Sequence, residues 1–222
     1  MNHLEKIVVA DIVCLVLLIG VELLRALRFA AQNRILRKKI YLDESTGLPN
    51  KNKCEEILSD STPLGEEEST AICVFDLNNL RIINNNLGHD KGDEYIRSFA
   101  EQLRLAVDPE NFVGRDGGDE FIAIFQKTDH SKMRETLKKI RTQMKNYSAK
   151  HPEMPISYAA GYAISLDFAG STLRELFRLA DKTCTWTKQG KDRRSGTKTA
   201  ESLRTAGMDQ KRKIPFFGLS VL

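Results

Sequence analysis

The chain of 222 residues has only four cysteines, and none of them belongs to a Cys-x-x-Cys pair. Cys14, Cys54, Cys73 and Cys184 are widely separated. This spacing excludes a disulfide scaffold, a zinc ribbon and a thioredoxin-type redox motif, and it suits a reducing compartment. The sequence also lacks the Gly-x-x-x-x-Gly-Lys-Ser/Thr motif, which excludes a P-loop nucleoside triphosphatase.

No single sign of charge prevails along the chain, although its net charge is +4. Residues 25–39 carry six basic and no acidic side chains, and a second basic block begins at Lys188. Between these blocks, residues 40–187 carry six more acidic than basic side chains. A nucleic-acid-binding domain is usually basic across its folded surface, so we expect no nucleic-acid partner.

The one long apolar run lies at residues 7–24 and is interrupted only by Asp11 and Glu22. Its length is near the lower limit for a membrane-spanning helix, which needs about 20 mostly apolar residues. The basic residues 25–39 would hold its C-terminal side in the cytoplasm. We therefore expect a single-pass protein of the inner (cytoplasmic) membrane, with a transmembrane helix in residues 1–24. The alternative is a buried or interfacial amphipathic helix.

The remaining chain divides into three parts. Residues 25–42 contain no Gly or Pro and keep a helical apolar spacing, which predicts a basic helical linker. Residues 43–194 are expected to form the folded domain. Residues 195–222 form a tail to which the sequence assigns no role.

The pattern of the folded domain predicts a fixed order of strands and helices. Apolar runs and turn signals indicate strands at residues 71–77, 111–114, 121–126 and 156–165, and helices at residues 51–59, 90–107, 131–150 and about 172–188. This order is that of the ferredoxin-like βαββαβ fold, an α+β class with helices on one face of an antiparallel sheet. The first and third strands then lie side by side, so Asp76 lies next to Asp119 and Glu120.

Carboxylates held this close repel each other unless a cation neutralises them. Oxygen ligands favour Mg²⁺ or Mn²⁺, whose remaining positions are taken by water and substrate phosphates. Gly117 and Gly118 have no side chains, so a nucleotide can approach their backbone. This combination fits nucleotidyl transfer. A hairpin turn with solvated acids is the alternative.

Five motifs resemble those of the GGDEF-domain diguanylate cyclases. They lie, in the family's order, at residues 43–50 (DESTGLPN), 75–85 (FDLNNLRIINN), 88–93 (GHDKGD), 115–121 (RDGGDEF) and 180–188 (ADKTCTWTK). The resemblance covers about residues 41–193 and implies a palm-type GGDEF catalytic domain over residues 43–194.

The resemblance also implies roles for particular residues. Asp76, Asp119 and the backbone carbonyl of Leu77 correspond to the metal ligands, and Glu120 corresponds to a further acid that assists the metals. Asp76, Asp119 and Glu120 are therefore the expected catalytic residues.

The residues expected to bind GTP lie around these acids. Asn84 and Asp93 correspond to the pair that binds the guanine edge, and Arg81 and Lys188 correspond to side chains that bind the triphosphate. Gly117 and Gly118 would lie against the nucleotide. Taken singly, Asp93 could be a helix cap, Asn84 a turn residue and Lys188 a solvated helix end.

The implied activity is the condensation of two GTP into cyclic di-GMP and two pyrophosphates, at a homodimer interface, in bacterial second-messenger signalling. The alternative is a weak or inactive GGDEF domain that acts as a membrane-tethered GTP-binding or protein-interaction regulator. Departures from the family pattern bear on the rate: Asn78 and Asn85 replace acids, and Leu80 replaces an aromatic residue. The family's R-x-x-D product-inhibition site would start at Asp108 and end at Asn111, so we expect no product binding there.

Overall fold

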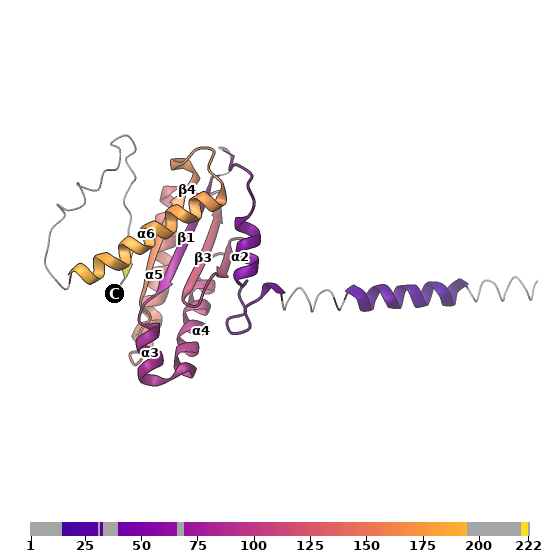
Figure 1. The fold of residues 1–222 in the computed structure, drawn as a ribbon, viewed down its shortest axis with the longest axis horizontal. Coiled ribbons are helices and arrows are strands. Elements are labelled where there is room, and N and C mark those ends of the chain that lie inside the picture. The colour runs from indigo at the N-terminus through magenta and orange to yellow at the C-terminus, as the bar shows by residue number, and fades with distance from the viewer. Residues whose placement is uncertain (1–14, 31, 33–39, 66–68, 195–218, 222) are drawn as a thin grey trace, which may run out of the picture. The chain divides into compact units, whose positions relative to one another are not determined.

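The computed structural model describes residues 15–30, 32, 40–65, 69–194 and 219–221 (Figure 1). Two units meet in the sequence between Leu42 and Asp43. In the first unit, residues 15–30 are helical, and ten of their large apolar side chains are exposed: Leu15, Val16, Leu17, Leu18, Ile19, Val21, Leu23, Leu24, Leu27 and Phe29.

The transmembrane helix expected in residues 1–24 is not found in the part of the chain that the structure describes. No helix there has both the length and the hydropathy needed to cross a bilayer. The first fourteen residues, which hold much of the apolar run, lie outside the described residues, as do residues 31 and 33–39 of the expected linker.

The second unit is built on an antiparallel sheet of five strands in the order β2-β3-β1-β4-β5 (Figure 1). The strands are β1 (Thr70–Leu77), β2 (Phe112–Arg115), β3 (Glu120–Gln126), β4 (Tyr158–Ile164) and β5 (Leu219–Val221). The expectation that the first and third strands lie side by side in an antiparallel sheet is confirmed. Strand β5 was not expected, because the sequence predicted no structure for the tail at residues 195–222.

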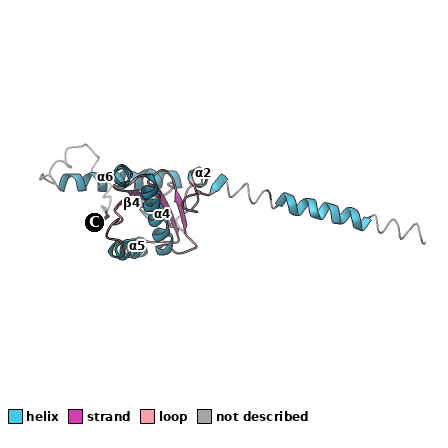
Figure 2. Ribbon diagram, turned by 90° about the horizontal axis from the view of Figure 1, so that it is seen from below, coloured by secondary structure: helices cyan, strands magenta, loops and turns pink. Residues whose placement is uncertain are grey.

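Helices cover both faces of this sheet (Figure 2). They are α2 (Lys51–Leu58), α3 (Leu80–Leu87), α4 (His89–Ala106), α5 (His130–Lys150) and α6 (Leu173–Arg194), with a short 3₁₀ helix, η1, at Ser165–Asp167. One core joins the sheet to α4 and α5, and a second joins it to α2 and α6. The expectation that all helices lie on one face is therefore wrong.

The sequence of β1 explains the two cores. Phe75 contributes to the core with α4 and α5, whereas Ile72 and Val74 contribute to the core with α2 and α6. Successive side chains of a strand point to opposite faces, so a strand that is apolar at nearly every position needs cover on both sides.

Helix α3 was also missed from the sequence. Three consecutive asparagines have weak helix propensity, but Leu80 and Ile83 pack against the core and hold the segment in place. Asn79, with φ +67°, precedes the helix, and Gly88, with φ +87°, separates it from α4. The left-handed backbone at Gly88 is one that glycine adopts readily.

Helix α6 begins at the expected capping box and packs tightly on β4. The Thr172 backbone N–H donates to Glu175 Oε2 at 2.8 Å, and the Glu175 N–H donates to Thr172 Oγ1 at 3.3 Å. A Cβ atom at Gly161 of β4 would collide with the α6 backbone at Ala180 and Cys184. Glycine at this position therefore sets how closely α6 approaches the sheet.

Candidate active site

The candidate active site lies where β1 ends and β3 begins. Asp76 pairs with Glu120 across the two strands, and the Leu77 N–H donates to the Asp119 carbonyl oxygen at 2.9 Å. The structure thus brings together the backbone of all four residues that were expected around a metal. The order of the strands is the cause, as the topology predicted.

The electrostatics at this sheet end fit a cation. Burial raises the pKa of Glu120, and the neighbouring charges of Asp119 and Asp76 raise it further. Among the described residues, no three His, Cys, Asp or Glu side chains form a group that could hold a metal by themselves. Carboxylate and carbonyl oxygens are nevertheless the donors that Mg²⁺ prefers, and Mg²⁺ commonly completes its shell with water and phosphate.

The Gly117–Gly118 turn is held by its own backbone and by a buried aromatic anchor. Asp116 and Gly117 both donate their N–H groups to the Glu120 carbonyl oxygen, at 2.9 and 3.2 Å. Next along β3, Phe121 is fully buried and packs edge-to-face on Phe99, with ring centroids 4.9 Å apart. The turn is therefore anchored to the core through the last residue of its motif.

The two glycines of the turn have different surroundings. A Cβ atom at Gly117 would lie 2.8 Å from Glu120 Oε2, so the Glu120 carboxylate packs against this residue. A Cβ atom at Gly118 would meet nothing within 4 Å. Gly117 accommodates a carboxylate, whereas Gly118 leaves open space beside the backbone.

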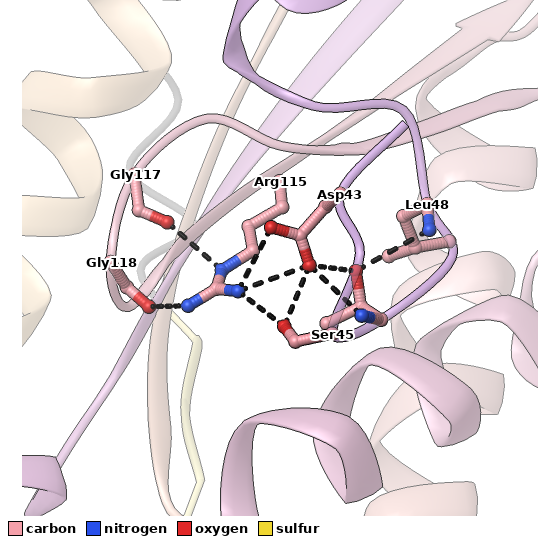
Figure 3. Close-up of polar contacts among 7 residues, drawn as sticks. Asp43, Ser45, Leu48, Arg115, Gly117 and Gly118 are labelled. Carbon is pink, nitrogen blue, oxygen red and sulfur yellow. Dashed lines mark hydrogen bonds and ion pairs between the residues drawn. The ribbon is translucent and has the colours of Figure 1, made fainter. Parts of the chain in front are cut away.

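Arg115 connects this turn to the loop at residues 43–50 (Figure 3). Its Nε donates to the Gly117 carbonyl oxygen at 3.1 Å, and its Nη2 donates to the Gly118 carbonyl oxygen at 2.8 Å. Its Nη1 lies 3.1 Å from both carboxylate oxygens of Asp43 and 2.7 Å from Ser45 Oγ. Arg115 and Asp43 lie in two of the sequence motifs, but the sequence predicted a role for neither of them.

Asp43 is a strong acceptor in this network. Besides Arg115, its Oδ1 accepts hydrogen bonds from Ser45 Oγ at 2.7 Å, the Thr46 N–H at 2.9 Å and Thr46 Oγ1 at 2.8 Å. Partial burial alone would raise the pKa of Asp43, but these hydrogen bonds and the charge of Arg115 lower it to about 2. Asp43 is therefore ionised at neutral pH.

The residues expected to bind guanine also lie together. The side-chain amide of Asn84 lies so close to Gly92 that a Cβ atom there would collide with it, and Asp93 is the next residue. Asp93 is not a helix cap, because α4 begins at His89 and Gly88 occupies the N-cap position. Asn84 is not a turn residue either, since it lies within α3.

The two cations expected at the triphosphate are placed less completely. Arg81 is exposed in the first turn of α3. Lys188 belongs to α6, but its side chain lies outside the described part of the chain.

A shallow hollow of about 510 Å³ lies on the side of the turn that faces α2. Its lining includes Lys51, Asn52, Arg115 and Asp116. Burial, followed by the charge of Glu55, raises the pKa of Asp116, whose Oδ1 has no hydrogen-bond partner among the described residues. The sequence predicted no role for Asp116.

The folded domain is similar in sequence to known proteins. A family model described as "Diguanylate cyclase, GGDEF domain" matches residues 40–194. The chain is 27% identical over 161 residues to the diguanylate cyclase DgcP of Pseudomonas aeruginosa, a match that covers 71% of this chain and 24% of DgcP. It is 25% identical over 161 residues to the cyclic di-GMP phosphodiesterase PdeR of Escherichia coli, covering 72% of this chain and 24% of PdeR. These matches span about a quarter of the length of either relative.

Solved structures show the same fold. The GGDEF domain of DgcB from Caulobacter crescentus, in complex with c-di-GMP, is 24% identical with a TM-score of 0.58, over 68% of this chain and 91% of that one. A structure of the coiled coil and GGDEF domain of DgcB is 21% identical with a TM-score of 0.65, over 78% of this chain and 93% of that one.

Proposed function

The chain belongs to the GGDEF diguanylate cyclase family, and we propose that it condenses two molecules of GTP into cyclic di-GMP with release of two pyrophosphates. The observation that carries this proposal is the pairing of Asp76 with Glu120, beside Asp119 and an open Gly118. This places metal-binding oxygens next to backbone that a nucleotide can approach.

The carboxylates of Asp76, Asp119 and Glu120, with the Leu77 carbonyl oxygen, would hold Mg²⁺ or Mn²⁺. The bound cation would offset the charge of the phosphates and of the attacking and leaving oxygens. Without it, the acids that raise the pKa of Glu120 would also repel a triphosphate. The same residues therefore need the cation to accept the substrate.

Asn84 and Asp93 would select the base. A carboxylate at Asp93 can accept hydrogen bonds from guanine N1–H and N2–H₂, and the Asn84 amide can bond the remaining polar atoms of the base edge. Adenine presents no donor at N1 and no amino group at C2, so it would leave the Asp93 carboxylate unpaired. The closeness of Asn84 to Gly92, next to Asp93, supports a shared role.

The reaction requires two copies of the domain. The 3′-hydroxyl of each GTP attacks the α-phosphorus of the other, the bond from that phosphorus to the bridging oxygen of the β-phosphate breaks, and pyrophosphate leaves. The hydroxyl proton is released as the new ester forms. Since one domain presents one set of carboxylates, we propose a homodimer with the two sites facing each other.

The experiment is incubation of the full chain with GTP and Mg²⁺, followed by nucleotide chromatography. We expect cyclic di-GMP and pyrophosphate from the natural chain and neither from Asp119→Ala, which removes one expected metal ligand. Circular dichroism should show that Asp119→Ala keeps its fold. Near-normal turnover by Asp119→Ala would contradict the metal assignment.

A second candidate function is a GGDEF domain that binds GTP or a partner protein without turnover. Two observations favour it: PdeR, one of the similar proteins, is named a phosphodiesterase, and Asn78 and Asn85 stand where the family usually has acids. If the natural chain binds GTP but forms no product with Mg²⁺ or Mn²⁺, this second function replaces the first.

We also propose that the N-terminal segment attaches the protein to the inner membrane, with the GGDEF domain in the cytoplasm. The apolar run at residues 7–24, the exposed apolar side chains of residues 15–24 and the basic block at residues 25–39 support this. The full chain should then sediment with membranes in high salt and be released by detergent. Release by salt alone would contradict the proposal.

A further inference from the structure

Arg115 holds two consecutive peptide groups of the Gly117–Gly118 turn, and we propose that it is a positioning residue for the nucleotide's phosphates. In this role it turns the backbone N–H groups of Gly118 and Asp119 towards a phosphate group of GTP. The inference rests on the proposed function, because it concerns how the same site binds its substrate.

The geometry of the trans peptide bond sets the direction of the N–H groups in the turn. Arg115 donates from Nε to the Gly117 carbonyl oxygen and from Nη2 to the Gly118 carbonyl oxygen. No cis peptide bond occurs in the described residues. In a trans peptide group the C=O and the following N–H point in opposite directions. The N–H groups of Gly118 and Asp119 therefore point away from the guanidinium.

These two N–H groups are available to a ligand. Across the described ranges, neither Gly118 nor Asp119 donates a backbone hydrogen bond. The open space where a Cβ atom of Gly118 would lie leaves room for a ligand to approach. Successive backbone N–H groups with a shared direction form a site for an anion.

Arg115 acts in this role by its shape rather than by its charge. The two oxygens of Asp43 lie 3.1 Å from Nη1, so the guanidinium charge is already offset by a carboxylate. Ser45 Oγ accepts from the same nitrogen, and only 15% of the Arg115 side chain is exposed. A group that is neutralised and largely buried attracts a phosphate weakly, but it can fix two carbonyl groups at once.

Lysine cannot replace the branched guanidinium group of Arg115. A guanidinium presents several N–H donors in one plane, whereas an ammonium is a single point charge on a flexible stem. Arg115→Lys keeps the positive charge beside Asp43 but cannot hold both carbonyl oxygens and the carboxylate in the same geometry. This variant therefore separates positioning from simple attraction.

The test compares the binding of GTP and of guanosine to the full chain, by ligand-observed NMR. The variants are Arg115→Lys and Arg115→Ala, with Lys139→Ala as a matched control. Lys139, on α5, forms an exposed ion pair with Asp108, so its loss removes one cation without touching the turn. Guanosine has the base and the sugar but no phosphate, so the difference between the two ligands isolates the phosphate contacts.

We expect both Arg115 variants to bind GTP about 10-fold more weakly or worse, because two hydrogen bonds to a charged group lose their alignment. Guanosine binding should be unchanged in both variants, and the control should behave like the natural chain. Where turnover is measurable, the KM for GTP should rise in both Arg115→Lys and Arg115→Ala. In both variants kcat should also fall, by as much as about 100-fold, because the reacting groups are misplaced.

Full GTP affinity in Arg115→Lys would overturn the proposal, since charge alone would then suffice. An equal loss of GTP and guanosine binding would also overturn it, because that is the result of general unfolding. If the natural chain binds GTP without forming product, the proposed activity fails, yet the comparison of the two ligands still tests Arg115.

Discussion

Replacing Asp43 by asparagine should destabilise the folded domain in a way that depends on pH. Asparagine has the same shape but no charge. Its amide oxygen can replace Oδ1, which accepts from Ser45 and Thr46, but its NH₂ group cannot accept from Arg115 Nη1 as Oδ2 does. The variant therefore keeps the packing of the 43–50 loop and removes only its ionised acceptor.

The magnitude follows from the pKa of Asp43, which falls from an ordinary 3.8 to about 2 in the folded chain. That difference corresponds to at most about 2.4 kcal/mol of stability at pH 7. Solvent screening of this incompletely buried carboxylate reduces the expected loss to about 1–2 kcal/mol. For a domain of this size, the melting temperature should fall by about 2–4 °C for each kcal/mol lost.

The pH dependence has a definite sign. Because the folded pKa is depressed, the stabilisation is complete above the unfolded pKa near 4 and is lost as the pH falls through about 2. The gap in free energy of unfolding between the natural chain and Asp43→Asn should therefore be constant from pH 7 to 5. By pH 3 it should have shrunk to about half.

Urea unfolding followed by circular dichroism at pH 7, 5 and 3 measures this gap. Asp60→Asn is a suitable control, because Asp60 also accepts a local backbone hydrogen bond, from Thr62 at 2.9 Å, but is exposed. We expect little change from it at any pH. A gap for Asp43→Asn that is absent at pH 7, or that stays the same down to pH 3, would refute the reasoning.

Three further predictions concern selectivity, regulation and packing. Asp93→Ser should lower the preference for GTP over ATP in turnover assays, because the acceptor for guanine N1–H and N2–H₂ is lost; an unchanged preference would remove Asp93 from the base site. Cyclic di-GMP should not bind around Asp108, whose carboxylate would repel phosphates and pairs with Lys139 at 2.7 Å; product binding in calorimetry that Asp108→Ala abolishes would contradict this. Gly161→Ala should cost about 1–3 kcal/mol in urea unfolding, since the added methyl group meets the α6 backbone; unchanged stability would show that α6 can shift.

Local patterns in the sequence were sufficient for most of the elements of the folded domain. The apolar run at residues 71–77 became β1, and the Thr172–Glu175 capping box starts α6. These signals work because strand patterning, turn chemistry and capping depend on residues that are close in the chain. The order of elements then placed Asp76 beside Glu120, as the pairing of β1 with β3 shows.

Other features depended on contacts that no short window of sequence contains. Helix α3 has a weak intrinsic propensity and is held by the packing of Leu80 and Ile83. The second layer of helices follows from the burial of both faces of β1. Strand β5 pairs with β4 across a long separation in the chain, between Leu219–Val221 and residues 158–160.

The sequence by itself determined the family, the motif residues and the strand order that brings the acids together. Only the tertiary structure decided how the Gly117–Gly118 turn is held. Arg115 and Asp43 are 72 residues apart, and each looks like an ordinary charged residue in its own segment. Their hydrogen bonds exist because the sheet brings the 43–50 loop to the turn, where partial burial lets one guanidinium bond to a carboxylate and two carbonyl groups together.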